Sequence, residues 1–240
     1  MAGFIRLAIL AAALTLSAAA SAEEVDLELV LLADATGSID NNEIRFQRQG
    51  YAEALTDPDV LDAIEKGIHQ KIAVTYVEWG DFTSQDVVVP WRIIGSAGEA
   101  QAFADELLVP PRRARGRNAI GQALLFGKTA IETNEHEGIR KVIDLSADSA
   151  NSWNGVPLAM AREQVLAAGI TINGLAVLCR ICSGRPVTYD LEKAFDETII
   201  GGPESFVITA DDERRFAIAV RNKLILEIAA LTPSDMQVRN

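Results

Sequence analysis

Residues 25–38 of the chain read VDLELVLLADATGS, and this stretch decides the fold. Its second half, Leu29–Ala33, is continuously apolar, which predicts a central strand that is covered on both faces. A helix is predicted from about Asn42 to Leu55, because apolar residues recur there with helical spacing. Asp40 precedes this helix and Glu43 follows three residues later, which is the pattern of a capping box. The chain therefore opens with a strand, a polar loop and a helix.

The rest of the chain continues this pattern. Ile72–Trp79 and Val87–Ile94 are rich in β-branched residues, and the segment between them is too short for a crossover helix, so they are predicted to form an antiparallel hairpin. The later strands are predicted at Lys141–Ser146, Thr171–Leu178 and Phe206–Ile208, and the later helices at Ala97–Leu107, Ala119–Thr133, Leu158–Ala168, Leu191–Thr198 and Asp211–Ala230. The alternation predicts an α/β fold with a doubly wound, mostly parallel six-stranded sheet, one antiparallel edge strand and helices on both faces.

The N-terminal residues have the pattern of a secretory signal peptide. Arg6 is followed by an apolar run, Leu7–Leu16, and by an Ala-Ser-Ala sequence that ends at Ala22. The run is shorter than the roughly 20 residues that a membrane-spanning helix needs. We therefore expect residues 1–22 to be removed, a single domain over residues 23–240, no transmembrane segment, and a periplasmic or secreted protein.

Charge and cysteine content limit the function further. The formal net charge of −12 repels nucleic acid, so no nucleic-acid partner is expected. The only two cysteines, Cys179 and Cys182, lie close together in a chain expected to mature in an oxidising compartment, which favours a local disulfide. Free structural thiols remain an alternative. A redox centre is less expected, because residues 183–186 break the helix that it would need.

Oxygen-bearing side chains follow two of the predicted strands. Asp34, Thr36 and Ser38 occupy alternate positions after the first strand, and Gly37 allows a tight turn between them. Asp148 follows the fourth strand, so parallel pairing brings it to the same edge of the sheet. Carboxylates and hydroxyls suit a hard cation such as Mg²⁺. The alternative is that the hydroxyls cap the following helix and the first carboxylate accepts backbone hydrogen bonds.

These features together resemble a von Willebrand factor A (VWA) domain, through the Asp34-x-Thr36-x-Ser38 motif, the early hairpin and Asp148. The chain also resembles, more narrowly, a bacterial secreted VWA-like family labelled as a domain of unknown function. The stretches that carry this narrower resemblance are Glu78-Trp79, Val89-Pro90-Trp91, Ala119-Ile120-Gly121 and Thr171-Ile172-Asn173-Gly174-Leu175. The resemblance extends over residues 25–230.

The resemblance implies a metal-ion-dependent adhesion site (MIDAS). VWA domains build it from an Asp-x-Ser-x-Ser motif, a Thr of a second loop and an Asp of a third. Carried over to this chain, the implied ligands are Asp34, Thr36, Ser38 and Asp148, with Mg²⁺ expected and Mn²⁺ or Ca²⁺ as alternatives. Asn118 stands where the family has its Thr. An amide carbonyl can coordinate a hard cation, but the longer side chain leaves open a vestigial site held by hydrogen bonds alone.

Residues near these positions are candidates for contact with a partner. Arg115 and Arg117 precede Asn118, and an arginine recognises carboxylates with two parallel hydrogen bonds. The alternative is that both arginines balance surface acids. Trp153 lies five residues after Asp148 and is expected to be exposed near the site. The partner expected from this set is a protein or peptide that presents a carboxylate.

Three functions are open at this point. The first is a binding module that holds an acidic group through the cation, and the second is a structural or assembly component whose cation site is inactive. The third, a metal-dependent hydrolase, lacks a general base near the cation loops, because His69 and His136 are far from them in sequence. Trp79 and Trp91 are expected in the core, and Asp144 in a structural ion pair or hydrogen bond.

Overall fold

The computed structural model describes residues 22–178, 188–210 and 213–230. The elements in chain order are β1 (Glu23–Asp34), α1 (Asn41–Leu55), α2 (Pro58–Glu65), β2 (Ile72–Trp79), β3 (Gln85–Ile94), α3 (Ala97–Leu108), α4 (Ile120–Glu132), β4 (His136–Ala147), α5 (Leu158–Ala167), β5 (Thr171–Val177), α6 (Leu191–Thr198), β6 (Val207–Ala210) and α7 (Glu213–Ala229). The predicted signal peptide, apart from its last residue, and the predicted Cys179–Cys182 disulfide lie outside the described residues.

The six strands form one sheet in the order β3-β2-β1-β4-β5-β6. Strand β1 is parallel to both of its neighbours, so Asp34 lies opposite Trp79 of β2, and Leu32 lies opposite Leu145 of β4. Only β3, at one edge, runs antiparallel, against β2. The predicted doubly wound, mostly parallel sheet is confirmed. The carboxyl ends of β1, β2 and β4 meet at one edge, where the candidate site lies.

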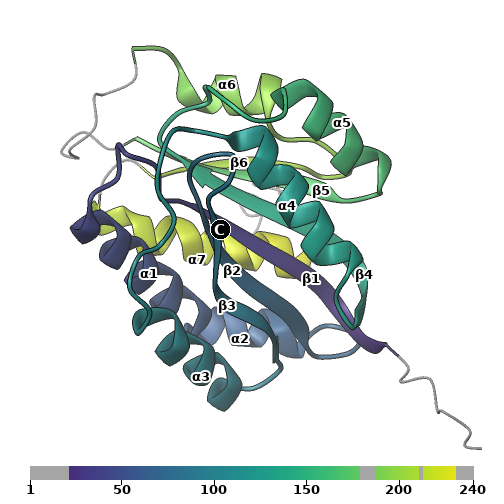
Figure 1. Ribbon diagram of the computed structural model, residues 1–240. Helices are drawn as coiled ribbons and strands as arrows, with labels where there is room; N and C mark the ends of the chain where they lie inside the picture. Colours follow the sequence, from purple (N-terminus) through teal and green to yellow (C-terminus); the bar gives the residue numbers. More distant parts are fainter. Residues whose placement is uncertain (1–21, 179–187, 211–212, 231–240) are drawn as a thin grey trace, which may run out of the picture.

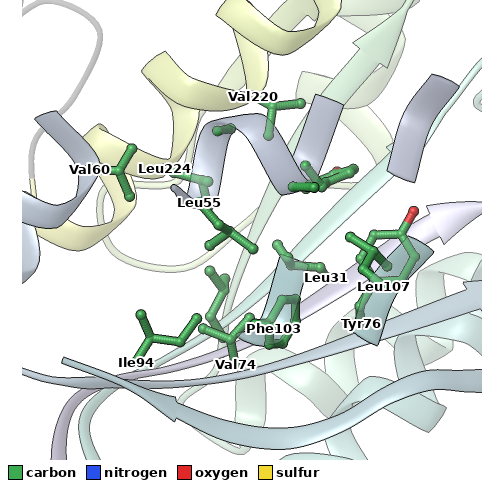
Figure 2. Close-up of a cluster of buried hydrophobic side chains, with 14 of the residues drawn as sticks. Leu31, Leu55, Val60, Val74, Tyr76, Ile94, Phe103, Leu107, Val220 and Leu224 are labelled. Atoms are coloured by element: carbon green, nitrogen blue, oxygen red, sulfur yellow. The ribbon is translucent and has the colours of Figure 1, made fainter. Parts of the chain in front are cut away.

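Helices cover both faces of the sheet (Figure 1). Alternate side chains of a strand point to opposite faces, so Leu29 and Leu31 pack in the cluster beneath α1, α2, α3 and α7, whereas Val30 and Leu32 pack against α4, α5 and α6. Figure 2 shows the first cluster, with side chains of the sheet close to those of the helices, labelled as Leu31, Val74, Tyr76, Leu55, Phe103, Leu107 and Leu224. Strand β1 is therefore the centre of two apolar layers, which fixes the position of the loop after it.

Helix α2 and the first part of β4 were not predicted. Asp57 caps α2 by accepting a hydrogen bond from the Asp59 amide at 2.9 Å, and a proline occupies the first helical position. Strand β4 begins at His136 rather than at Lys141, because its polar start continues the pairing with β1. The carboxylate of Glu28 on β1 accepts a hydrogen bond from the backbone there. Tertiary pairing extends this strand where its own residues show no strand pattern.

A charged cluster lies inside the layer between the sheet and α7. Asp144 of β4 pairs with Lys223 of α7 at 2.8 Å, which is the structural ion pair that the sequence predicted, and Lys223 also pairs with Glu227. The side-chain amide of Asn173 donates to Glu227 at 2.9 Å. All four residues are buried. Burial is the largest cause that raises the pKa of Asp144, to about 7, with Lys223 lowering it and Glu227 raising it.

The aromatic core predictions have a mixed outcome. Trp79 is fully buried, as predicted. Trp91 is half-buried, and its indole N–H donates to the Ala130 carbonyl at 3.2 Å. No helix in the described part of the chain is long and apolar enough to cross a membrane.

Candidate functional site

The loop between β1 and α1 holds its three oxygen-bearing side chains in one compact turn. The Asp34 carboxylate accepts a hydrogen bond from the Thr36 amide at 2.8 Å, and the hydroxyl oxygens of Thr36 and Ser38 are 3.1 Å apart. Gln47 of α1 donates to the Asp34 carbonyl at 3.3 Å. The second carboxylate oxygen of Asp34 is buried and accepts no hydrogen bond from any described residue. Hydrogen bonding from the Thr36 hydroxyl and the Asp148 amide also lowers the pKa of Asp34, so its second oxygen lacks a well-formed hydrogen bond but has polar neighbours.

Two other loops bring their candidate residues to the same place. Asp148 follows β4 and accepts a hydrogen bond from the Ser38 hydroxyl. Asn118 precedes Ala119, the N-cap of α4, and its backbone carbonyl accepts a hydrogen bond from the Trp153 amide at 2.7 Å. The three loops are therefore bonded to one another and are not merely adjacent.

A cleft of about 450 Å³ opens between these loops. It is lined by Gly37, Ser38, Gly116, Arg117, Asn118, Asp148, Ser149, Asn151, Trp153, Thr188 and Tyr189. Asp34 and Thr36 lie behind this lining, almost fully buried. Three of the five candidate cation residues thus face the cleft, and hydrogen bonds connect the other two to them through Ser38.

The two candidate partner arginines differ in position. Arg117 lines the cleft. Arg115 is exposed but does not contribute to the lining, and its main chain is fastened to the β2–β3 turn, where its amide donates to the Ser84 hydroxyl at 2.9 Å and its carbonyl accepts from the Asp81 amide at 2.9 Å. Of the two side chains, Arg117 is the better placed to reach a group bound in the cleft.

Two acids of the site, Asp34 and Asp148, lie close together without a basic side chain paired to either of them in the described residues. Burial raises the pKa of Asp34 to about 7, and the charge of Asp148 adds to the effect. Burial also raises the pKa of Asp148, while the Ser38 hydroxyl lowers it. Neither carboxylate is ion-paired with a lysine or arginine within the described ranges. A bound cation would therefore relieve both the repulsion between the two acids and the lack of a partner for the buried oxygen of Asp34.

The ligand chemistry is that of a hard cation. No group of three or more His, Cys, Asp and Glu side chains that could hold a metal occurs among the residues the structure describes. The candidate site instead combines two carboxylates with two hydroxyls and an amide oxygen, which is a donor set that Mg²⁺ accepts and that leaves room for water ligands. The residues present fit such an ion.

Arg112 is a residue of this site that the sequence did not single out. Its guanidinium donates to the Ala35 carbonyl at 2.6 Å, to the Thr36 carbonyl at 2.9 Å and to the Ile39 carbonyl at 2.6 Å. It also donates to the Ala114 carbonyl in its own loop at 3.1 Å. One side chain thus fixes the backbone of the loop that carries the candidate ligands.

Helix α1 fixes the other end of the arginine-rich loop. Arg48 is buried, pairs with Glu78 of β2 at 2.7 Å, and donates to the Pro110 carbonyl. Glu78 is one of the residues that carry the narrower family resemblance, and this contact gives it a structural role. The signal for Arg48 was a charged residue on the buried face of an amphipathic helix.

Solved structures with this fold include several VWA domains. The pilus adhesin SpaC from Lactobacillus rhamnosus GG is 15% identical, with a TM-score of 0.59 over 85% of this chain and 31% of its own. Proximal thread matrix protein 1 from the mussel byssus, with a zinc-occupied MIDAS motif, is 18% identical, with a TM-score of 0.59 over 86% of this chain and 48% of its own. A von Willebrand factor type A structure from Catenulispora acidiphila is 16% identical, with a TM-score of 0.59 over 85% of this chain and 43% of its own.

These likenesses show the VWA fold, and at such identities they show no more than the fold. The chain spans less than half the length of each of the three proteins. No curated protein sequence matches it significantly. A family model does match, over residues 24–232, and its description is "Protein of unknown function (DUF1194)". The chain, a VWA-like α/β domain, therefore belongs to the DUF1194 family.

Proposed function

We propose that this protein is an exported binding module that holds an acidic group of a partner protein through a divalent cation. The cation ligands in this proposal are Asp34, Thr36, Ser38, Asn118 and Asp148, and Mg²⁺ is the cation that the donor set favours. Mn²⁺ and Ca²⁺ are alternatives that the same oxygens accept. A cation that keeps an open position gains a carboxylate as its last ligand, and the surrounding loops select the partner.

One observation carries the proposal. Two carboxylates meet beside an open cleft with no basic side chain paired to either, and one oxygen of Asp34 is buried without a hydrogen bond from the described residues. A buried, unpaired carboxylate is unfavourable unless something neutralises it. Arg117 and Trp153 line the same cleft, which supports a second contact to the partner beside the cation.

Two further points support the export and the binding role. The predicted signal peptide directs the chain across a membrane. Proteins with the same fold include one named as a pilus adhesin and one named as a thread matrix protein, the latter with a zinc-occupied MIDAS.

The test is calorimetric titration of metal-stripped protein with Mg²⁺, Mn²⁺ and Ca²⁺. We expect one cation per chain for the wild type and none for Asp34→Ala, because that variant loses the buried carboxylate. Asn118→Thr restores the residue that VWA domains have at this position and should alter affinity or cation preference. Asp86→Ala serves as the matched control, because Asp86 is a partly buried carboxylate that pairs with Arg113 away from the cleft.

The outcomes separate a cation-dependent binding module from a structural component with an inactive site. Binding that the wild type lacks but Asn118→Thr gains would mean that the site has lost its cation and that the protein works as a structural or assembly component. Binding that survives Asp34→Ala would place the cation elsewhere and contradict the proposal.

A further inference from the structure

Exposed aromatic side chains of the described residues lie in and beside the cleft. Among the large hydrophobic side chains that the described chain leaves exposed, the aromatic ones are Trp153 at 66%, Phe82 at 52% and Tyr189 at 39%. Trp153 and Tyr189 line the cleft itself. Phe82 lies in the β2–β3 turn, next to the loop that carries Trp153, since a Cβ at Gly155 would approach the Cβ of Phe82 to 3.1 Å. Apolar surface gathered beside a polar cleft is typical of a binding surface.

Hydrogen bonds hold these aromatic residues in place. The Trp153 amide donates to the Asn118 carbonyl at 2.7 Å, so this exposed residue is fastened to a candidate cation ligand. The carboxylate of Asp81 accepts from the Phe82 amide at 2.7 Å and from the Asn154 side chain at 2.8 Å, which joins the turn to the Trp153 loop. An exposed aromatic residue on a braced backbone loses little conformational freedom when a partner binds, and this favours affinity.

The loop that carries Trp153 is braced on its other side as well. The hydroxyl of Tyr189 accepts a hydrogen bond from the Ala150 amide at 3.0 Å. Tyr189 stands just before α6, so the loop after β4 is held between the β2–β3 turn and the segment that leads into α6. The cleft therefore has aromatic walls that are positioned before any partner arrives.

The charge of the rim selects the partner. Arg115 and Arg117 are exposed beside the cleft and make no ion pair with any described residue, in a chain whose net charge is −12. Tryptophan, tyrosine and arginine are the residues that dominate the binding energy of protein interfaces, whereas acidic side chains are depleted there. The rim thus offers aromatic contact and positive charge together, which is complementary to a segment that is acidic and apolar at once.

We infer that the rim binds a protein segment in which a large apolar side chain lies within two residues of the carboxylate. This inference rests on the proposed function, because the carboxylate is the group that the cation holds. The Trp153 amide is bonded to the Asn118 carbonyl and both residues line the cleft, so we expect an extended segment held by its carboxylate to reach Trp153 within one or two residues, at roughly 3.3 Å per residue. The apolar neighbour packs on Trp153 and Phe82, and Arg117 adds a hydrogen bond to the acid or to a second one.

The test is selection from a random twelve-residue peptide library displayed on phage, with the purified chain in Mg²⁺ and elution by EDTA. We expect the eluted peptides to carry Asp or Glu with Trp, Phe, Tyr, Leu or Ile within two positions. A synthetic peptide of the selected sequence should bind Trp153→Ala about tenfold more weakly or worse, and Phe82→Ala more weakly by a smaller factor. Trp153→Phe keeps an aromatic ring and should recover most of the affinity.

Met160→Ala is the matched control, because this large side chain is 55% exposed on α5 but does not line the cleft. Acidic peptides that elute with EDTA but show no apolar preference would overturn the inference and leave the proposed function intact. If no peptide depends on Mg²⁺, the proposed function itself fails, and the inference falls with it.

Discussion

Two pairs of acids in this molecule have the same chemistry and opposite surroundings. Asp144 and Glu227 lie in the core with Lys223 between them, whereas Asp34 and Asp148 lie at the edge of the sheet without a paired base in the described part of the chain. Burial raises the pKa of Asp34 and of Asp144 to about 7. Lys223 neutralises the core pair, whereas the edge pair, Asp34 and Asp148, lies beside an open cleft.

The arginine that holds the loop after β1 makes the contrast sharper. Arg112 donates all of its described hydrogen bonds to backbone carbonyls, none of them to Asp34 or Asp148. The hydrogen bonds of Arg112 are thus used by the loop, and its charge acts on Asp34 without an ion pair. We propose that the edge cluster takes an ion from solution where the core cluster has its own lysine, and four predictions test this difference.

Removing the lysine of the core cluster should have the largest effect on stability. Lys223→Met leaves Asp144 and Glu227 buried without their base, so we expect the free energy of unfolding to fall by about 3–5 kcal/mol in urea denaturation at pH 7. Lys193→Met is the control, since Lys193 pairs with Glu197 on the surface and such a pair contributes about 1 kcal/mol or less. A loss for Lys223→Met no greater than that of the control would mean that the buried acids do not need the lysine.

Adding a cation to the edge cluster should have the next largest effect. A divalent ion present at 100 times its dissociation constant stabilises the folded protein by about 2.7 kcal/mol. This corresponds to a rise in Tm of roughly 5–10 °C for a domain of this size, measured by calorimetry with Mg²⁺ and with EDTA. The rise should vanish in Asp34→Asn and persist in Asp144→Asn, because only the first acid belongs to the edge cluster. An equal rise in both variants would contradict the comparison.

Removing the residue that fixes the edge loop should have a moderate effect. Arg112→Ala leaves carbonyls of residues 35, 36, 39 and 114 without their donor, so we expect a loss of about 1–3 kcal/mol in stability. Cation affinity should fall by about tenfold or more, because residues that orient the ligands affect metal binding to that extent. Arg113→Ala is the control, because Arg113 is exposed and forms a long ion pair with Asp86, with 3.7 Å between Nη1 and Oδ1. Equal stability and equal cation affinity of the two variants would mean that Arg112 does not position the cation ligands.

The sequence predicted the features that depend on local patterns. The apolar run Leu29–Ala33 and the turn after it predicted the central strand, and the alternation of strands and helices predicted a mostly parallel six-stranded sheet with one antiparallel edge strand. The Asp57-Pro58 start also indicates helix α2. The helix was not predicted because it is only eight residues long and follows α1 closely. Boundaries failed where pairing decided them, as at His136, because the partner strand supplies the order there.

The candidate site was predictable only in part, for a related reason. The Asp-x-Thr-x-Ser spacing is visible along the chain, and Asp148 follows from parallel pairing. Arg112 is one of four arginines within six residues, and only its contacts with a loop more than 70 residues away distinguish it from the others. Asp144 was recognised as structural, yet its partner Lys223 lies on another element, and nothing in the sequence connects the two.

The pH dependence of the core cluster should give the smallest effect and the finest test. Because burial raises the pKa of Asp144 to about 7 from its usual value near 4, the folded protein binds more protons than the unfolded chain between these limits. Its contribution to stability is therefore largest below about pH 4 and is lost as the pH rises through about 7. Asp144→Asn should change stability at pH 7 by only about 1 kcal/mol, since the amide resembles the protonated acid and still accepts a hydrogen bond from Lys223. The variant should lack this part of the slope of stability against pH, measured by urea denaturation between about pH 4 and pH 7. A slope unchanged from the wild type would mean that Lys223 holds Asp144 ionised throughout, so that the core acid is neutralised by ion pairing and not by protonation.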